Sequence, residues 1–343
     1  MKIAVDAMGG DDAPRSPVNG AVLAARELQS EIVLVGDEVK LNAALAEHGN
    51  PAGISVVHAE QAIEMDEPVA TAIRRKRKSS IHVGARLLRD REVDGFISAG
   101  STGAVMAVTK VIVGTLDGID RPSLAVVLPT QAGPAVVLDV GANVDPKSEQ
   151  LVQFALIGDE FAKALLGIPS PRIGLLSIGE EAGKGNELVR TAHGVLRDQS
   201  INFVGNVEAK DLYRGKADVV VCDGFAGNIL LKSSEAVVEM MRHLMRKEFK
   251  RTLAGRVSAL LARGTFSRLR KRVDPDEFGG ALLLGVRGLT VIGHGSSSPR
   301  MICNAVRLVE GYGERDLNSR VEEAVAHLVA ARPEKGADME TAG

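Results

Sequence analysis

Short apolar runs alternate with longer amphipathic stretches along most of the chain. Several of the short runs are continuously apolar and rich in Val, Ile and Leu, which is typical of strands that are covered on both faces. The expected strands are residues 2–7, 31–37, 54–59, 95–101, 123–129, 134–141, 172–179, 201–207, 217–224 and 289–295. The stretches with helical spacing are residues 16–29, 68–90, 149–167 and 185–199. This alternation predicts an α/β fold in which helices cover both faces of a mostly parallel sheet.

Polar, glycine-rich segments follow the predicted strands. In open α/β sheets, ligands bind at the carboxyl ends of the strands. A single glycine cluster is also explained by a tight turn, because glycine adopts backbone conformations that other residues avoid. Seven clusters together predict one crevice that is lined by many loops. The clusters are residues 7–11, 98–104, 139–143, 178–186, 205–208, 222–228 and 293–298.

The alternation stops between residues 242 and 272. This segment contains eleven Lys and Arg residues and one acidic residue, Glu248, so its net charge is +10. Met245, Phe249, Leu253 and Val257 recur every four positions, and this spacing predicts an amphipathic helix or helix pair. A solvated helix, a nucleic-acid arm, and a surface for anionic lipid or an acidic partner protein all fit this pattern. Lipid or an acidic partner is favoured, because interfacial helices combine basic and apolar faces in this way.

The composition of the 343 residues narrows the class of protein. Aromatic residues make up only 3% and hydrophobic residues 45%, which predicts an aliphatic core and disfavours base stacking on nucleic acid. The net charge of −2 gives no reason to expect a polyanion as partner. Two cysteines, no signal-like segment and no apolar run of membrane length predict a cytoplasmic protein. The polar tail, residues 332–343, is expected to be disordered.

Most standard catalytic motifs are missing. The histidines and cysteines form no HExxH or CxxC pattern, so no metal site is expected. No G-x-G-x-x-G follows a strand, and no G-x-S-x-G occurs. The segment 179–185 has too few residues between its glycines for a phosphate loop, and Gly185 stands where Ser or Thr is required. Cys222 ends an apolar run, which predicts a buried structural thiol rather than a nucleophile.

Small polar donors remain as candidates for the chemistry. Lys184 stands between two glycines and can meet an anion as a point charge, although an exposed surface lysine fits as well. Asn228 follows the glycine cluster 222–227 at the expected start of a helix, where backbone N–H groups favour anions. The other candidate donors are Ser101, Thr102, His294, Ser296 and Ser297. A site that offers hydrogen-bond donors but no paired nucleophile and base favours a reaction in which a bound anion attacks an activated acyl group directly.

The sequence closely resembles the bacterial phosphate acyltransferases of phospholipid synthesis. The motifs that carry the resemblance run in order from residue 6 to residue 297: DAMGGD, SAGSTGA, DVGAN, GEE with KGNE, GNVE, CDGFAGN followed by ILLK, GGALLLG and HGSS. The family commonly has Asn where this chain has Ser101 and often has Thr where it has Ala226.

The resemblance implies a reaction, a fold and partners. A long-chain acyl group passes from its thioester on acyl carrier protein to inorganic phosphate, which gives acyl phosphate for a membrane-bound glycerol-3-phosphate acyltransferase. No cofactor and no metal are implied. The implied fold is a three-layer αβα, Rossmann-like sandwich similar to those of phosphotransacetylases and the isocitrate-dehydrogenase group. A single catalytic domain, residues 1–331, forms a homodimer, from which the helical segment 239–273 protrudes to a membrane surface.

The resemblance also assigns roles to residues. Lys184 and Asn228 occupy the positions of the family's proposed catalytic residues. Asp6 and Asp11 are expected to orient Lys184, a backbone amide or another loop. The expected phosphate and substrate residues are Asp6, Gly9, Gly10, Asp11, Ser101, Thr102, Gly103, Asp139, Asn143, Asp223, Gly224, Gly227, His294 and Ser296. The expected membrane or carrier contacts are Phe249, Leu253, Arg256, Val257, Leu260, Leu261 and Arg263.

Three other functions share some of these features. A phosphotransacetylase-like enzyme would use acyl-coenzyme A instead of acyl carrier protein. A non-catalytic scaffold would bind lipid surfaces without cleaving thioesters. A nicotinamide-dependent dehydrogenase would share the fold and consume a dinucleotide. The phosphate acyltransferase reading, in which the product is delivered to a membrane enzyme, predicts peripheral association with the inner face of the membrane.

Overall fold

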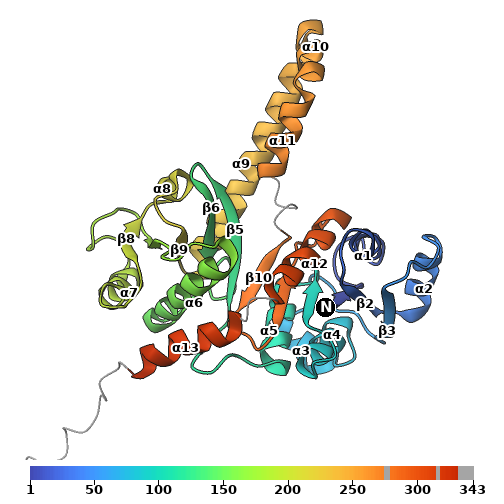
Figure 1. The fold of residues 1–343 in the computed structure, drawn as a ribbon, viewed down its shortest axis with the longest axis horizontal. Helices are drawn as coiled ribbons and strands as arrows, with labels where there is room; N and C mark the ends of the chain where they lie inside the picture. Colours follow the sequence, from blue (N-terminus) through green and yellow to red (C-terminus); the bar gives the residue numbers. More distant parts are fainter. Residues whose placement is uncertain (274–278, 314–316, 331–343) are drawn as a thin grey trace, which may run out of the picture.

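A single eleven-stranded sheet organises the computed structural model, which describes residues 1–273, 279–313 and 317–330 (Figure 1). The predicted disordered tail, residues 332–343, lies outside the described residues. The strands are β1 (Lys2–Asp6), β2 (Glu31–Gly36), β3 (Ile54–His58), β4 (Gly95–Ser98), β5 (Ser123–Thr130), β6 (Gly133–Leu138), β7 (Ile173–Leu176), β8 (Phe203–Val207), β9 (Val219–Val221), β10 (Ala281–Leu284) and β11 (Leu289–Ile292). Their order across the sheet is β3-β2-β1-β4-β11-β10-β5-β6-β9-β7-β8.

The sheet consists of two parallel blocks that run in opposite directions. The first block contains β3, β2, β1, β4 and β11, and the second contains β6, β9, β7 and β8. Between them, β10 is antiparallel to both β11 and β5, and β5 is antiparallel to β6. Three successive antiparallel pairings reverse the strand direction. The registers place Val5, Ile97, Val291, Leu282, Ala125 and Leu138 in one row across the sheet, so the carboxyl ends of the two blocks lie at nearly the same level and point in opposite directions.

Helices cover both faces of this sheet, as the alternation predicts. They are α1 (Arg15–Glu27), α2 (Glu38–Ala46), α3 (Val69–Arg75), α4 (Ser80–Arg89), α5 (Thr102–Ile112), α6 (Ser148–Leu166), α7 (Glu187–Arg197), α8 (Ala209–Arg214), α9 (Gly224–Arg251), α10 (Leu253–Leu261), α11 (Arg263–Val273), α12 (Pro299–Gly313) and α13 (Leu317–Ala330). Side chains of α1, α2, α6, α7, α12 and α13 belong to one buried apolar cluster. Those of α3, α4, α5, α8 and the start of α9 belong to a second cluster.

The cores of both clusters are mainly aliphatic, as the composition predicts. The largest fully buried side chains include four aromatic ones, and the ring of Phe161 stacks on that of Tyr312 at 5.3 Å. Phe96 fills the second cluster beneath α4, where Gly84 leaves room for its ring. The remaining space is filled by Val, Leu, Ile and Ala, which pack well between a sheet and helices.

Three elements differ from the sequence pattern or were not expected from it. Residues 68–90 form two helices, α3 and α4, because the chain leaves the helical conformation after Arg75 and Ser79 caps a new helix by accepting a hydrogen bond from the His82 amide at 3.4 Å. Residues 123–138 form an antiparallel hairpin, because the two residues between β5 and β6 cannot make a parallel crossover. The strand β10, within the motif GGALLLG, was not expected, because four residues are too few to show a clear hydrophobic periodicity.

A helical projection extends away from the sheet (Figure 1). The 28 residues of α9 correspond to about 42 Å at 1.5 Å per residue. Only Gly224 and Gly227, in its first turn, are buried. Beyond the sheet, α10 and α11 fold back along α9, and the ring of Phe249 meets that of Phe266 edge-on at 5.2 Å. No helix among residues 1–273, 279–313 and 317–330 has the length and apolar character that crossing a bilayer requires.

Alanine substitutions at two glycines, one buried and one exposed, test the packing of α4 on the sheet. A Cβ at Gly84 would lie 2.6 Å from Cδ2 of the fully buried Phe96, whereas one at Gly194, in exposed α7, would meet no atom within 4 Å. Alanine gains about 1 kcal/mol over glycine within a helix, but overpacking a core costs about 1–3 kcal/mol. We expect Gly84→Ala to lower the free energy of unfolding by about 1 kcal/mol and Gly194→Ala to raise it, measured by urea denaturation. Equal stabilisation by both changes would contradict this packing.

Candidate functional site

The glycine-rich segments fall into two groups, which follow the two parallel blocks of the sheet. The first, which we call the Asn228 group, contains the loop 139–144, the loop 177–186 and the first turn of α9, and it follows β6, β7 and β9. The second, which we call the Asp6 group, contains residues 6–12, 98–103 and 293–297 and follows β1, β4 and β11. The separation arises because the two parallel blocks run in opposite directions, a feature that motif order along the chain does not reveal.

Asp139 anchors the loop at the end of β6. Its fully buried carboxylate accepts hydrogen bonds from the amides of Leu124, Gly141, Ala142 and Asn143 at 2.7–3.2 Å. Nδ2 of Asn143 donates to the same carboxylate at 2.7 Å and to the carbonyl of Pro122 at 2.8 Å. Burial raises the pKa of the Asp139 carboxyl, and these hydrogen bonds act in the opposite direction. Because its acceptor sites are occupied, Asp139 shapes the loop and is not placed to bind phosphate.

The first turn of α9 fits closely against this loop. The amide of Gly224 donates to the carbonyl of Asn143 at 2.7 Å, and a Cβ at Gly227 would overlap the carbonyl oxygen of Asp139. Asp223 caps the helix by accepting a hydrogen bond from the Ala226 amide at 2.8 Å. The side chain of Asn228 is exposed and lies next to Gly141. A Cβ atom placed on Gly141 would be 3.7 Å from Oδ1 of Asn228.

Lys184 lies on the neighbouring loop. The strands β7 and β9 are adjacent, so the loop after β7 and the helix after β9 start side by side. The side chain of Lys184 is exposed, its amide donates to the carbonyl of Glu181 at 2.9 Å, and Gly185 follows with a φ of 98°. Asn186 then caps α7 by accepting from the Val189 amide at 2.9 Å. The structure thus brings Lys184, Asn228 and the loop after β6 to one edge of the sheet.

Cys222 lies directly beneath the Asn228 group. It is buried, and its Sγ is 3.4 Å from the carbonyl oxygen of Asp139. Burial raises the pKa of its thiol well above the ordinary value, and the negative charges of Asp139 and Asp223 add to this effect. A buried thiol with a raised pKa is a poor nucleophile, as the sequence predicts.

The Asp6 group is held together by a buried carboxylate of its own. Asp6, 1% exposed, accepts hydrogen bonds from Oγ of Ser98 at 2.6 Å and from the Met8 amide at 3.0 Å. Oγ of Ser98 in turn accepts from the Gly100 amide at 3.1 Å. Burial raises the pKa of the Asp6 carboxyl, which the hydrogen bonds from Ser80, Ser98 and the backbone oppose. Asp6 therefore orients Ser98 and a backbone amide of its own group.

The loops of the Asp6 group interlock tightly. The Asp11 amide donates to the carbonyl of Gly295 at 2.8 Å, and the glycine pair 9–10 packs against residues 99, 100 and 295. Nδ1 of His294 and Oγ of Ser296 form an exposed pair at 2.7 Å. The crevice that Gly9, Gly10, Asp12, Ser16 and Gly295 help to line has no space for a water molecule.

The start of α5 belongs to the same edge. Ser101 precedes the helix without capping it through its side chain, and Thr102 is exposed. A Cβ at Gly103 would lie 2.9 Å from Cγ2 of Val69 in α3, so this turn is packed against the neighbouring helix. Ser101, Thr102 and Gly103 thus lie with Asp6, Gly9 and Gly10 and not with Lys184 and Asn228.

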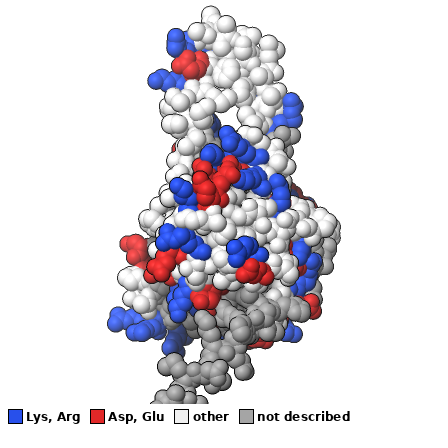
Figure 2. All heavy atoms as spheres, turned by 90° about the vertical axis from the view of Figure 1, so that its left-hand side faces the viewer, with Lys and Arg blue, Asp and Glu red and all other residues white. Residues whose placement is uncertain are grey.

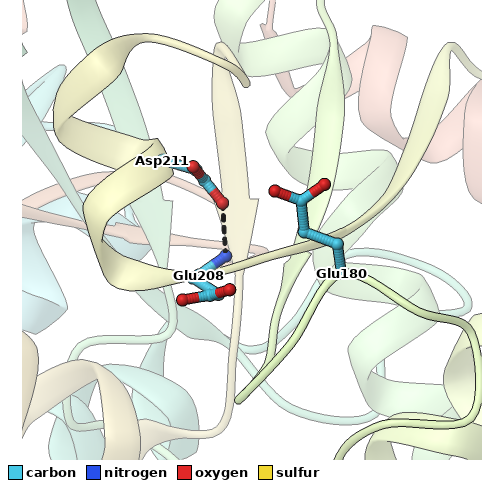
Figure 3. Close-up of side chains that lie close together, drawn as sticks. All are labelled: Glu180, Glu208 and Asp211. Atoms are coloured by element: carbon cyan, nitrogen blue, oxygen red, sulfur yellow. Dashed lines mark hydrogen bonds between the residues drawn. The ribbon is translucent and has the colours of Figure 1, made fainter.

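The structure also brings together three carboxylates that the sequence analysis missed, Glu180, Glu208 and Asp211 (Figure 3). Nζ of Lys216 lies 2.7 Å from Glu180, and Nζ of Lys210 lies 2.8 Å from Glu208. Asp211 accepts a hydrogen bond from the Glu208 amide at 3.1 Å and so caps α8. These partners account for the cluster as an ion-pair network. The sequence signal for this cluster was the presence of acidic residues after both β7 and β8. The carboxyl ends of adjacent parallel strands lie close together, so side chains that follow them can form one cluster.

The projection presents apolar side chains at its outer end. Leu253, Val257, Leu260 and Leu261 are exposed, as are Arg256 and Arg263. Figure 2 shows largely uncharged surface there, with Lys and Arg side chains below it and at its margins. Phe249 is half-buried, because its ring packs on Phe266 between α9 and α11. It helps to hold the two helices together.

Comparison with known proteins agrees with the resemblance found in the motifs. A family model described as "Fatty acid synthesis protein" matches residues 1–320. Phosphate acyltransferase from Acidobacterium capsulatum is 46% identical over 322 residues, which cover 93% of this chain and 96% of that protein. Phosphate acyltransferase from Aquifex aeolicus is 45% identical over 323 residues, which cover 94% of this chain and 96% of that protein.

Solved structures support the fold. A phosphotransacetylase from Streptococcus pyogenes superposes with a TM-score of 0.60 at 17% identity, over 95% of this chain and 94% of that one. A branched-chain phosphotransacylase from Enterococcus faecalis gives a TM-score of 0.56 at 16% identity, over 92% and 99%. The predicted likeness to phosphotransacetylases is thus confirmed at the level of the fold. By sequence and by fold together, the chain belongs to the phosphate acyltransferase family, whose curated members are acyltransferase enzymes.

Proposed function

We propose that this chain transfers a long-chain fatty acyl group from acyl carrier protein to inorganic phosphate. A phosphate oxygen attacks the thioester carbonyl carbon, a C–O bond forms and the C–S bond breaks. The thiolate of the carrier leaves and takes the proton that hydrogen phosphate gives up. The products are acyl phosphate and free carrier protein, and no oxidant, metal or cofactor is needed to balance the reaction.

One observation carries this proposal: Lys184 and Asn228 follow the adjacent strands β7 and β9, and the side chain of Asn228 lies next to Gly141 in the loop after β6. The first turn of a long helix favours negative charge, because its backbone N–H groups have no partners within the helix. Lys184 adds a full positive charge at the same edge. The names of the curated relatives, all phosphate acyltransferases, supply phosphate as the acceptor.

The proposed roles follow from the chemistry of each group. Lys184 holds phosphate against the loop 141–143 and stabilises negative charge as the C–O bond forms. The side-chain amide of Asn228 donates a hydrogen bond to the thioester carbonyl oxygen, which becomes an oxyanion during attack. Phosphate is the nucleophile itself, so no acyl-enzyme forms. The burial and raised thiol pKa of Cys222 agree with this direct attack.

The projection supports proposals about partners. Acyl carrier protein is the donor, and the basic segment 242–272 attracts an acidic carrier and an anionic membrane surface through the same field. The exposed leucines at its outer end enter the interface of the bilayer. We further propose a homodimer that works in the cytoplasm at the inner face of the membrane. There its product reaches the membrane-bound glycerol-3-phosphate acyltransferase. No nucleic-acid partner is proposed, given the low aromatic content.

Replacing Lys184 tests the reaction and its site. With acyl carrier protein thioester and phosphate as substrates, we expect Lys184→Ala to lower kcat for acyl phosphate formation about 100-fold or more. Lys40→Ala, on the exposed surface of α2, is the matched control and should keep full activity. Full kcat in Lys184→Ala would exclude this role. A wild-type protein that forms no acyl phosphate would exclude the proposed reaction as a whole.

Replacing Asn228 tests whether this residue contributes to catalysis or only to substrate binding. Its hydrogen bond is expected to strengthen as the carbonyl oxygen becomes negative, so Asn228→Ala should lower kcat about 100-fold with little change in KM for the thioester. Asn42→Ala, an exposed asparagine on α2, serves as the control. A rise in KM with unchanged kcat would show that Asn228 only binds the ground state.

The outer end of the projection can be tested with lipid vesicles. We expect the double change Leu260→Glu and Leu261→Glu to abolish flotation with anionic vesicles, because it places two carboxylates in an apolar contact near negative lipid. Turnover of soluble substrates should be largely retained. Val39→Glu changes an equally exposed apolar residue on α2 and should leave flotation intact. Unchanged flotation of the leucine variant would show that this end does not touch the bilayer.

A further inference from the structure

Four large apolar side chains are exposed around the Asn228 group. Val144, Ile178, Phe225 and Ile229 have exposed fractions of 64%, 83%, 60% and 49%. Large apolar side chains gathered on one part of a surface indicate a binding site more than scattered ones do. We call these four residues the apolar rim.

Backbone contacts place the members of the rim next to one another. Val144 follows Asn143, whose carbonyl accepts the Gly224 hydrogen bond at 2.7 Å, and Phe225 follows Gly224. Phe225 and Ile229 are four residues apart on α9 and so share one face of the helix. The strands β7 and β9 pair Leu175 with Val221, so Ile178 and Phe225 follow the ends of two adjacent strands.

Each segment that contributes to the rim also carries a polar residue of the Asn228 group. Val144 follows Asn143, Ile178 opens the loop that carries Lys184, and Phe225 and Ile229 flank Asn228. Sites for small molecules combine mostly apolar lining with a few placed polar groups. A ligand with a polar reacting end and an apolar remainder would use both kinds of residue at once.

The size of the rim argues against a second copy of the chain as its occupant. A standard protein interface needs about 20–30 residues on each side, whereas the rim has four. The other exposed apolar residues of α9, Val237, Met240, Met241 and Leu244, are separated from it by exposed Lys232 and Ser233. Lys232 forms an ion pair with Glu235 at 3.1 Å, so charged surface interrupts the apolar stripe there.

We propose that the apolar rim binds the hydrocarbon chain of the acyl donor and sets the enzyme's preference for long chains. This inference rests on the proposed acyl transfer at Lys184 and Asn228. The thioester carbonyl lies at Asn228, and the methylene groups that follow it lie on Phe225, Ile229, Ile178 and Val144. Each methylene group that leaves water strengthens binding about fourfold, so rim contacts favour longer chains.

A chain-length series tests the rim. Acyl carrier protein loaded with four- to sixteen-carbon acyl groups is turned over by the wild type, Phe225→Ser and Ile178→Ser. We expect KM for the sixteen-carbon donor to rise about tenfold in each variant, while KM for the four-carbon donor and kcat stay unchanged. Val39→Ser, 80% exposed on α2, is the matched control and should keep the wild-type preference.

The possible results separate the inference from the reaction on which it rests. If the wild type is active but Phe225→Ser and Ile178→Ser change KM equally at all chain lengths or not at all, the rim does not bind the acyl chain. If Phe225→Ser alters the mass measured by sedimentation and keeps the chain-length preference, a second copy covers the rim and the inference is overturned. If the wild type forms no acyl phosphate from any donor, the proposed function itself fails.

Discussion

The buried carboxylate of Asp139 is the interaction on which the arrangement of the candidate site depends. A carboxylate without exposure is costly unless its acceptor sites are occupied, and here four backbone amides and the Asn143 side chain occupy them. This bonding fixes the loop after β6 in one shape. The start of α9 then fits against that loop only because Gly224 and Gly227 have no side chains. The position of Asn228 follows from both contacts.

The reversal of strand direction in the middle of the sheet divides the glycine-rich strand ends into two groups that point in opposite directions. In a fully parallel sheet, every glycine-rich strand end would lie at one edge. Here β10 and the β5–β6 hairpin reverse the direction, and the Asp6 group closes on itself around a second buried carboxylate. The two groups resemble each other in construction, since each uses an aspartate at a strand end to hold backbone amides. They differ in charge and access, because only the Asn228 group has an exposed lysine beside a helix start.

A single helix joins the candidate site to the projection. The first turn of α9 carries Asn228, and its far end supports α10 and α11, about 42 Å away at 1.5 Å per residue. Under the proposed function, the same rigid element positions the thioester and reaches toward the carrier or the membrane. The packing of Phe249 on Phe266 keeps the returning helix against α9. On these helices, exposed apolar residues lie at the outer end, around Asn228, and along the middle of α9 at Val237, Met240, Met241 and Leu244.

The sequence by itself determined the fold class, the aliphatic core, the basic segment and the family, because these depend on local patterns and on motifs read in order. It also identified Lys184, Asn228 and Asp6 as residues of interest. Only the tertiary structure decided that Lys184 and Asn228 follow adjacent strands, since this depends on pairing between strands that are distant in sequence, such as β7 and β9. The ion pairs around Glu180 and the apolar rim were equally hidden. Their members come from separate segments, and only the sheet brings them together.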